Sequence, residues 1–272
     1  MDKLPVSIVV PCYNEYSLTL ECLGRIHEAT PEVESIIVVD DGSYVFETEY
    51  LCDTLIRHSQ NKGAAPSFND GIALSRSKYV ALFNNDTMVA NGWLEPLVEF
   101  MEENQTIPIT GSHLPARIGM VSPRVFGPEE DVAEGIHINY PYRSSYEDWV
   151  KNYSTLAVPD GKLEVMPFDK GGPWLFRMDM FHQIGLFDEQ FVPANWEETD
   201  LFVRMALHGW IFCSLNSSYS YHFCHGTINK HFKEEGGVLG LYHINKERFE
   251  KKWGTTNIDL MKVFMTRSIN GL

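Results

Sequence analysis

The sequence lacks any apolar run close to the ~18 residues that a membrane-spanning helix needs. Its first residues, MDKLPVSIVVP, hold an apolar segment that is too short for a secretory signal. We therefore expect a protein of the cytoplasm. The chain of 272 residues is 44% hydrophobic and 12% aromatic, which is enough to form a sizeable buried core.

Basic residues are scarce, with 22 Lys and Arg against 37 Asp and Glu, and the net charge is -15. Such a surface repels phosphates, which argues against a nucleic acid as partner. The acidic excess fits a solvated acidic face or a cation site, and composition alone leaves both open. The five cysteines stand singly, without a C-x-x-C pair, so we expect reduced thiols and neither disulfides nor a zinc site.

Short β-rich runs alternate with longer amphipathic ones over the first hundred residues, which predicts βαβ units and a largely parallel sheet. The predicted strands are 6–11, 34–43 and 78–83, and the predicted helices are 16–29, 63–77 and 92–104. Residues 107–164 hold only short apolar runs, so we expect loops and small strands there. A further helix is expected around Leu201, Met205 and Leu207. One domain with a C-terminal extension fits this pattern.

Each of the three predicted strands ends in a polar cluster. The clusters are Tyr13, Asn14 and Glu15, then Asp40, Asp41 and Ser43, then Asn84, Asn85 and Asp86. In an open parallel sheet the carboxyl ends of the strands share one edge, and ligands bind in the crevice beside it. The three clusters are therefore expected to converge in a ligand site.

Several segments, taken in their order along the chain, resemble the family 2 glycosyltransferases of the GT-A fold. They are VSIVVPCYNE, IIVVDDGS, NKGAAPSFNDGIALSRSKYVALFNNDTMVANGWL, GGPWLFRMDMFHQIGLFDEQF and WEETDLFVRMALHGW. The segment LFNNDTMV is similar to the rhamnosyltransferase-like branch. The resemblance implies an α/β fold of GT-A type, with a mostly parallel central sheet flanked by helices. It implies a glycosyltransferase domain over 1–230, divided into a nucleotide-sugar-binding half (1–105) and an acceptor and catalytic half (106–230), with a C-terminal helical extension at 231–272.

The implied reaction moves a hexosyl or rhamnosyl group from a UDP-, dTDP- or GDP-linked donor to a hydroxyl acceptor, with inversion, in polysaccharide or glycan synthesis. Negative charge grows on the leaving diphosphate, and Mn²⁺ or Mg²⁺ offsets it as a Lewis acid. The resemblance assigns Asp86 to the metal, with His222 of YHFCHGT completing its shell or touching the diphosphate. Asn84 stands where relatives often carry an acid, so its amide is expected to position ribose or phosphate. Alternatively, NND is a strand-end turn that caps its own backbone.

The donor site that the resemblance implies is built on the strand ends and two glycine-containing turns. Asp41 accepts from the nucleobase imide, and Asp40 contacts the base or ribose or braces the turn. Lys62 steadies a phosphate or is an exposed lysine, and Trp174 stacks on a sugar or is a buried aromatic beside a turn. The full set is Pro11, Tyr13, Glu15, Asp40, Asp41, Asn61, Lys62, Gly63, Asn84, Asn85, Gly172 and Trp174.

The segment WEETDLFVR resembles the place where the family carries its catalytic base. Glu198 matches the usual aspartate of an acid pair and Glu197 the acid before it, and the choice between them stays open. A carboxylate here removes the proton of the acceptor hydroxyl. Asp200 and Arg204 are spaced for an ion pair within the helix. Read without the resemblance, these acids simply stabilise a helix N-terminus.

Two other functions stay open. A sugar-phosphate nucleotidyltransferase grips triphosphate with a glycine-rich, basic loop after its first strand, and PCYNEYSL has neither glycine nor a basic residue. A nucleotide-sugar-binding module without catalysis is the other alternative. The segment NKERFEKKWG is expected to form a basic amphipathic helix that packs on the domain or touches an acceptor or the surface of a membrane.

Overall fold

The computed structural model describes residues 3–30, 32–45, 51–107, 115–128, 142–154, 163–164, 171–224 and 226–254. The first part of the chain forms β1 (Leu4–Cys12), α1 (Tyr16–Ala29), β2 (Val33–Asp40), β3 (Thr54–Arg57), α2 (Ala64–Leu74), β4 (Tyr79–Leu82), β5 (Thr87–Val89), α3 (Glu95–Glu103) and β6 (Thr106–Ile107). The second part forms β7 (Ala116–Gly127), β8 (Tyr142–Arg143), α4 (Tyr146–Asn152), β9 (Leu163–Glu164), β10 (Trp174–Arg177), α5 (Met178–Ile184), α6 (Glu197–Leu207), β11 (Trp210–His222), α7 (Gly226–His231) and α8 (Gly237–Trp253).

These strands form one sheet in the order β3-β2-β1-β4-β10-β7-β11-β5. The part from β3 to β4 is parallel, as the βαβ pattern predicts. Beyond β4 the sheet is mixed, because β10 runs antiparallel to both β4 and β7, and β5 runs antiparallel to β11. The short strands β6 and β8 pair with β7, and β9 pairs with β11.

The long strand β7 lies where the sequence predicts only loops and small strands, and that prediction was wrong for 116–127. Its sequence, ARIGMVSPRVFG, is broken by Pro123, which has no N–H to donate to a ladder. The partner strand accommodates this residue, because the register of β11 shifts just after the pair Leu215 and Pro123 and resumes at Tyr219 and Arg124. Most of the other residues between 107 and 164 lie outside the described residues.

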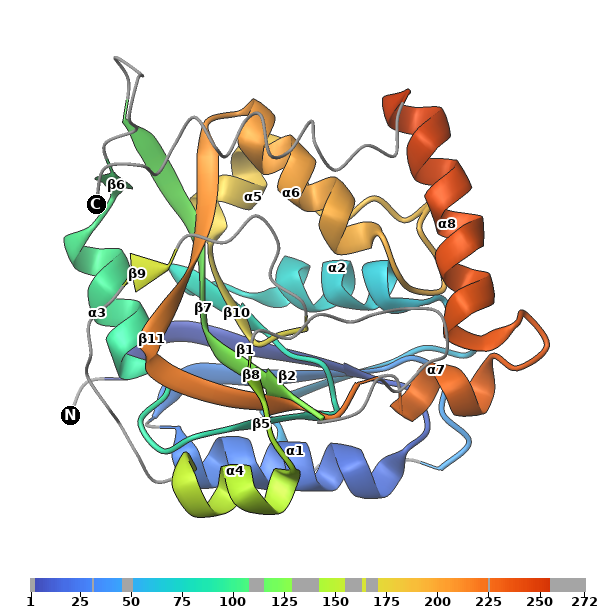
Figure 1. Ribbon diagram of the computed structural model, residues 1–272, viewed down its shortest axis with the longest axis horizontal. Helices are drawn as coiled ribbons and strands as arrows, with labels where there is room; N and C mark the ends of the chain where they lie inside the picture. The colour runs from blue at the N-terminus through green and yellow to red at the C-terminus, as the bar shows by residue number, and fades with distance from the viewer. Residues whose placement is uncertain are drawn as a thin grey trace.

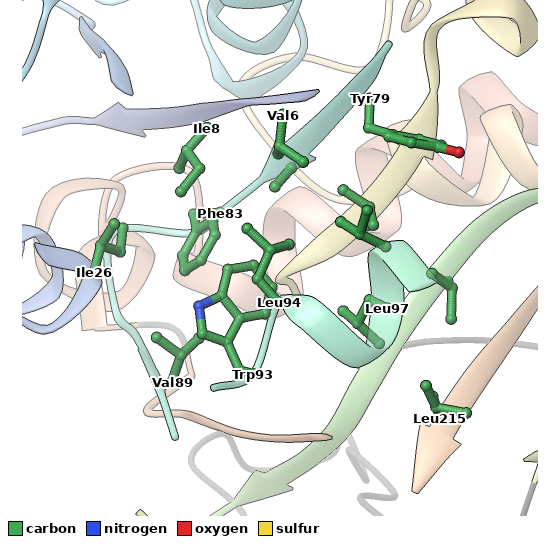
Figure 2. Close-up of a cluster of buried hydrophobic side chains, with 14 of the residues drawn as sticks. Val6, Ile8, Ile26, Tyr79, Phe83, Val89, Trp93, Leu94, Leu97 and Leu215 are labelled. Atoms are coloured by element: carbon green, nitrogen blue, oxygen red, sulfur yellow. The ribbon is translucent and has the colours of Figure 1, made fainter. Parts of the chain in front are cut away.

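Helices cover both faces of the sheet, with α1 and α4 on one side and α2, α5 and α6 on the other (Figure 1). Side chains of β1 alternate between the two faces, as the period of a strand requires. Ile8 belongs to the cluster that packs under α1, and Val9 to the cluster that packs under α2. Figure 2 shows Phe83 and Trp93 in the α1-side cluster, with their ring centroids 5.2 Å apart.

Apolar spacing explains the helices that carry the site. The buried residues of α1 are Thr19, Cys22, Leu23, Ile26 and Ala29, which form one stripe at three- and four-residue intervals. In α2 the glycine at mid-helix has a steric reason. A Cβ on Gly71 would lie 2.3 Å from Cγ1 of Val9, so only glycine lets α2 pack this closely on β1.

The C-terminal segment folds back onto the domain. Helix α8 stands at the edge of the molecule beside α6, and α7 lies next to it (Figure 1). Phe249 of α8 packs against Phe191 and Trp196. The segment NKERFEKKWG was expected to pack on the domain or to touch an acceptor or a membrane surface, and the structure shows packing on the domain. No helix in the part of the chain that the structure describes is long and apolar enough to cross a membrane.

The parallel register brings the ends of β1 and β2 level, and β4 ends three residues short of the end of β1. Cys12 at the end of β1 pairs with Asp40 at the end of β2, and Val9 pairs with Leu82 at the end of β4. The residues that follow these ends therefore emerge along one edge of the sheet. This is the arrangement that the polar clusters predict.

Candidate active site

Asp86 and His222 meet although they are far apart in the sequence. The antiparallel pairing of β5 and β11 sets His222 opposite Thr87, and the amide of Phe223 donates to the carbonyl of Asp86 over 3.0 Å. His222 Nε2 lies 2.9 Å from Asp86 Oδ1 and 3.2 Å from Asn84 Nδ2. Both the carboxylate and the imidazole are more than nine-tenths buried. The structure thus joins the two predicted metal ligands.

The spacing of these two atoms suits a divalent cation. Two ligands at about 2.1 Å from one ion and at right angles to each other lie about 3 Å apart. An oxygen from Asp86 and a nitrogen from His222 at 2.9 Å meet that condition. Within the described ranges, no three His, Cys, Asp or Glu side chains are grouped so as to hold a metal. Phosphate oxygens and water, which are usual ligands of Mg²⁺, would complete the shell of an ion held by Asp86 and His222.

The orientation of the His222 ring is fixed on its far side. Cys224 Sγ lies 3.5 Å from His222 Nδ1, and the same thiol donates to the carbonyl of His222 over 3.3 Å. A Cβ on Gly171 would lie 2.0 Å from Nδ1, so the ring occupies the space that a side chain would fill. These contacts hold the ring with Nε2 directed at Asp86.

Asp41 organises the turn before α2. Its Oδ1 accepts from the amide of Lys62 and its Oδ2 from the amide of Gly63, each over 2.8 Å. His58 Nδ1 lies 2.6 Å from Asp41 Oδ1, and His58 Nε2 lies 2.9 Å from Asp70 Oδ2. The protein itself thus supplies three donors to Asp41, and the contact with a nucleobase imide stays a proposal.

Asp40 is buried, and in this structure its carboxylate braces the turn after β2. Its Oδ1 accepts from the amide of Ser43 over 2.9 Å, and Arg57 Nε lies 3.0 Å from its Oδ2. Ser43 Oγ in turn accepts from the amide of Asn14 over 2.7 Å. The ends of β1 and β2 are therefore tied together, and the first two polar clusters converge as expected.

Glu15 and Tyr13, which follow β1, contact residues of α7 and Phe232 directly after it. Lys230 Nζ donates to Glu15 over 2.5 Å, and His231 Nε2 lies 2.8 Å from its other oxygen. Burial raises the pKa of Glu15, but the hydrogen bonds and charges of Lys230 and His231 outweigh it and lower the pKa overall. The Tyr13 ring contacts His231 and Phe232. The C-terminal segment therefore borders the predicted donor pocket.

Two residues of the predicted donor set point elsewhere. Asn85 donates over 2.9 Å to Thr19 of α1, so its amide links the end of β4 to that helix. Trp174 is 4% exposed, and its ring packs against Phe68 and Phe202. The ring is enclosed as in the buried-aromatic alternative, and stacking on a sugar stays a proposal.

The remaining predicted donor residues lie along the same edge. Lys62 is exposed, and its Nζ lies 3.6 Å from Asp70 Oδ2. Gly172 is buried, and a Cβ there would lie 2.8 Å from the carbonyl of Leu82, so glycine allows this turn to touch β4. Pro11 and Asn61 are half-buried.

The acid pair begins α6. Glu197 is buried, whereas Glu198 is half-buried. Burial raises the pKa of Glu197 well above its usual value, and the charge of Glu198 and the hydrogen bond between the two carboxyl groups raise it further. This direction favours a protonated Glu197 beside Glu198.

Asp200, one turn further on, is fully buried and forms the predicted ion pair with Arg204, whose Nε donates to Oδ2 over 2.9 Å. Its Oδ1 accepts from Lys252 over 2.6 Å and from Trp253 Nε1 over 2.9 Å. Asp200 is therefore held by α6 and α8 together.

A backbone contact connects the donor turn to the acid pair. The amide of Ala64 donates to the carbonyl of Pro193 over 2.7 Å, four residues before Glu197. A Cβ on Gly63 would lie 2.9 Å from the same carbonyl, so glycine is needed for this approach. The turn before α2 and the segment before α6 are thus packed against each other.

His58 and Cys224 act on this site and were missing from the predicted set. His58 comes directly after β3, so the rule that polar residues follow strand ends could have identified it. Cys224 lies in the segment HFCHGT beside a candidate ligand, and nothing in the sequence alone separates it from the other single cysteines.

The chain spans well under half of the curated relatives that it matches first. Glycosyltransferase GlyG of Streptococcus pneumoniae serotype 4 is 31% identical over 117 residues, which are 40% of this chain and 38% of GlyG. The uncharacterised glycosyltransferase EpsJ of Bacillus subtilis is 32% identical over 107 residues, which are 37% of this chain and 31% of EpsJ.

Solved structures show that the fold is of GT-A type. The mannosyltransferase PcManGT of Pyrobaculum calidifontis, in complex with GDP-Man and Mn²⁺, superposes with a TM-score of 0.57 at 17% identity over 89% of this chain and 64% of its own. GalNAc-T7, with UDP, GalNAc and Mn²⁺, gives a TM-score of 0.59 at 15% identity over 80% of this chain and 43% of its own. The model of glycosyl transferase family 2 matches residues 7–185, which is more than half of the sequence. The chain therefore belongs to glycosyl transferase family 2.

Proposed function

We propose that this chain transfers a sugar from a nucleotide-diphosphate sugar to a hydroxyl acceptor, with inversion at the anomeric carbon. The observation that carries the proposal is the meeting of Asp86 and His222 at 2.9 Å on the edge where β1, β2 and β4 end. The family and the UDP, GDP-Man and Mn²⁺ in the neighbours' structures support the donor class and the metal. When bound to these residues, Mn²⁺ or Mg²⁺ would supply Lewis-acid stabilisation of the diphosphate leaving group.

The acid pair performs the proton transfer. The acceptor oxygen attacks the anomeric carbon from the face opposite the diphosphate, and its proton passes to Glu198. The bond between the anomeric carbon and the diphosphate oxygen breaks, and its electron pair leaves with the nucleoside diphosphate. Glu197 keeps its own proton and hydrogen-bonds to Glu198, which orients the accepting carboxylate. A single displacement of this kind inverts the configuration.

The strand-end clusters hold the donor. Asp41 and His58 fix the turn at 61–63 that leads into α2, and the exposed Lys62 of this turn would steady a phosphate of the donor. Glu15 and Tyr13 border the pocket for base and ribose. We infer a UDP-, dTDP- or GDP-linked donor with a hexosyl or rhamnosyl group. The acceptor half includes residues 107–164, of which 108–114, 129–141 and 155–162 lie outside the described residues.

A donor panel tests the proposal. The chain is incubated with UDP-glucose, UDP-GlcNAc, dTDP-rhamnose and GDP-mannose, with and without Mn²⁺, and released nucleoside diphosphate is measured. Release from one donor that requires the metal is the expected result. Binding of a donor without release would favour the binding module. Release of pyrophosphate from a sugar phosphate and a nucleoside triphosphate would instead favour a nucleotidyltransferase.

A further inference from the structure

The backbone just before the acid pair is held in a conformation that side chains rarely adopt. Asn195 and Trp196 have φ angles of 73° and 75°, and Glu197 follows at once. Left-handed residues other than glycine are strained, and they persist only where the surrounding structure fixes them. Asparagine tolerates this region, but a bulky residue such as tryptophan is a genuine outlier. Something must hold this segment.

The group that holds the backbone is a buried amide on α8. Asn245 is fully buried, and its Nδ2 donates to the carbonyl of Ala194 over 2.8 Å and to that of Asn195 over 3.0 Å. Its Oδ1 accepts from Arg248 Nη1 over 2.8 Å. The same Arg248 nitrogen donates to the carbonyl of Val192 over 2.7 Å. One amide thus satisfies two consecutive carbonyls and is itself oriented by a neighbour on its own helix.

Aromatic packing from the same helix holds the second left-handed residue. The ring of Trp196 lies between Tyr242 and Phe249, with centroid distances of 5.2 Å and 4.9 Å. Asn245 stands between these two aromatics in the sequence of α8, so one face of the helix contacts both the backbone and the ring. The segment from Ala194 to Trp196 is therefore fixed from α8 and has little freedom to relax.

The end of α8 also fixes the residue that follows the acid pair. Trp253 and Lys252 donate to Asp200, as described above. Helix α8 thus holds the chain both before and after Glu197 and Glu198. Neither α8 nor the acid pair lies within residues 7–185, which the family model matches.

We propose that Asn245 is a positioning residue for the acid pair: its amide holds the left-handed turn from which Glu197 and Glu198 enter the site. Asn245 acts through the Ala194 and Asn195 carbonyls and does not touch substrate. The assignment of the pair to catalysis rests on the proposed function. The hydrogen bonds from Asn245 to this turn are a property of the fold, and their effect is measurable without any donor.

Hydrogen exchange of the full chain tests whether Asn245 restrains the turn. Asn245→Asp keeps the size of the side chain but replaces the donating NH₂ with an accepting oxygen, which faces two carbonyls. Amide exchange in the peptide covering 194–200 should become about tenfold faster, while exchange in β1 and α1 stays unchanged. Asn245→Ser keeps one hydroxyl donor and should give a smaller increase. Glu247→Gln on the exposed side of α8 is the matched control and should exchange like the wild type.

Kinetics separate positioning from a general loss of stability. Asn245→Ser should lower kcat about tenfold with little change in KM for the donor, because the acid pair shifts while the Asp86 side of the site stays in place. Unchanged exchange at 194–200 in both variants would overturn the inference, as would wild-type kcat alongside faster exchange. If Asn245→Asp unfolds globally, the exchange and kinetics of Asn245→Ser alone decide whether Asn245 positions the acid pair. If the wild type turns over no donor, the proposed function fails, and the exchange result still decides whether Asn245 holds the turn.

Discussion

The donor edge and the acid pair are built in different ways. At the donor edge, aspartates bind backbone amides in neighbouring turns, such as Asp40 with Ser43 and Asp41 with Gly63. The acid pair is fixed instead by a helix about fifty residues later in the chain, through Asn245 and Trp253. The donor edge is therefore set by strand register and local turns, whereas the geometry of the acid pair depends on the docking of α8.

The largest effect should come from breaking the metal ligand at the donor edge. Asp86→Ala removes the carboxylate whose Oδ1 lies 2.9 Å from His222 Nε2. The leaving diphosphate then loses several kcal/mol of stabilisation, so donor release should fall about 10³-fold or more. Mn²⁺ binding, followed by electron paramagnetic resonance in the presence of nucleoside diphosphate, should be lost in parallel. Glu247→Gln, at an exposed position of α8, is the control. Full metal-dependent release by Asp86→Ala would show that the cation is held elsewhere.

Breaking the acid pair should separate turnover from binding. Glu198→Gln keeps the shape of the side chain but cannot accept a proton, so kcat should fall about 10²-fold or more. Donor affinity, measured by calorimetry with metal, should match the wild type, in contrast to Asp86→Ala. Wild-type turnover by Glu198→Gln would transfer the role of base to Glu197.

The contrast between a donor edge built on local turns and an acid pair fixed by α8 explains which parts of the site could be predicted from the sequence. The strand-end clusters were predicted because short apolar runs, turns and parallel register are local properties, and Asp40, Asp41 and Asp86 do lie at those ends. The ion pair of Asp200 with Arg204 followed from helical spacing. The joining of Asp86 to His222 came from the resemblance, since no local pattern pairs residues so far apart.

What the sequence missed depends on packing between distant segments. The strand β7 was overlooked because its run is interrupted by Pro123, and the shift in β11 that accommodates this residue lies about ninety residues later. For Trp174 the sequence left a sugar contact and a buried aromatic both open, because a turn with two glycines beside an aromatic looks alike in a pocket and in a core. Only the positions of Phe68 and Phe202 decide between them. The role of Asn245 likewise exists only once α8 is docked.

A smaller effect should follow from loosening the donor turn. His58 contacts both Asp41 and Asp70 and so fixes the carboxylate that binds the amides of the 61–63 turn. His58→Leu should weaken donor affinity about three- to tenfold while kcat at saturating donor stays near the wild type, because the acid pair is untouched. Calorimetric titration with nucleoside diphosphate measures this. His27→Leu, at an exposed histidine on α1, is the control. A drop in kcat with unchanged affinity would mean that the turn serves the acid pair and not the donor.

The smallest expected effect is a change in how stability depends on pH. It tests the separate roles of Glu197 and Glu198 without any substrate. Burial and Glu198 raise the pKa of Glu197 well above its usual 4.5. As the pH rises above about 4.5, this carboxyl loses its proton in the unfolded chain but keeps it in the folded one. The unfolded state then binds fewer protons, so the free energy of unfolding falls until the pH passes the raised pKa.

Glu197→Gln is neutral in both states and removes this contribution. Its thermal midpoint should therefore fall less steeply than that of the wild type between pH 5 and pH 8, and at pH 8 it should be the more stable protein. Glu247→Gln, at an exposed position, should instead follow the wild-type curve. Parallel curves for Glu197→Gln and the wild type would mean that Glu197 is ionised at neutral pH, in which case it could accept the proton and the base would have to be assigned afresh.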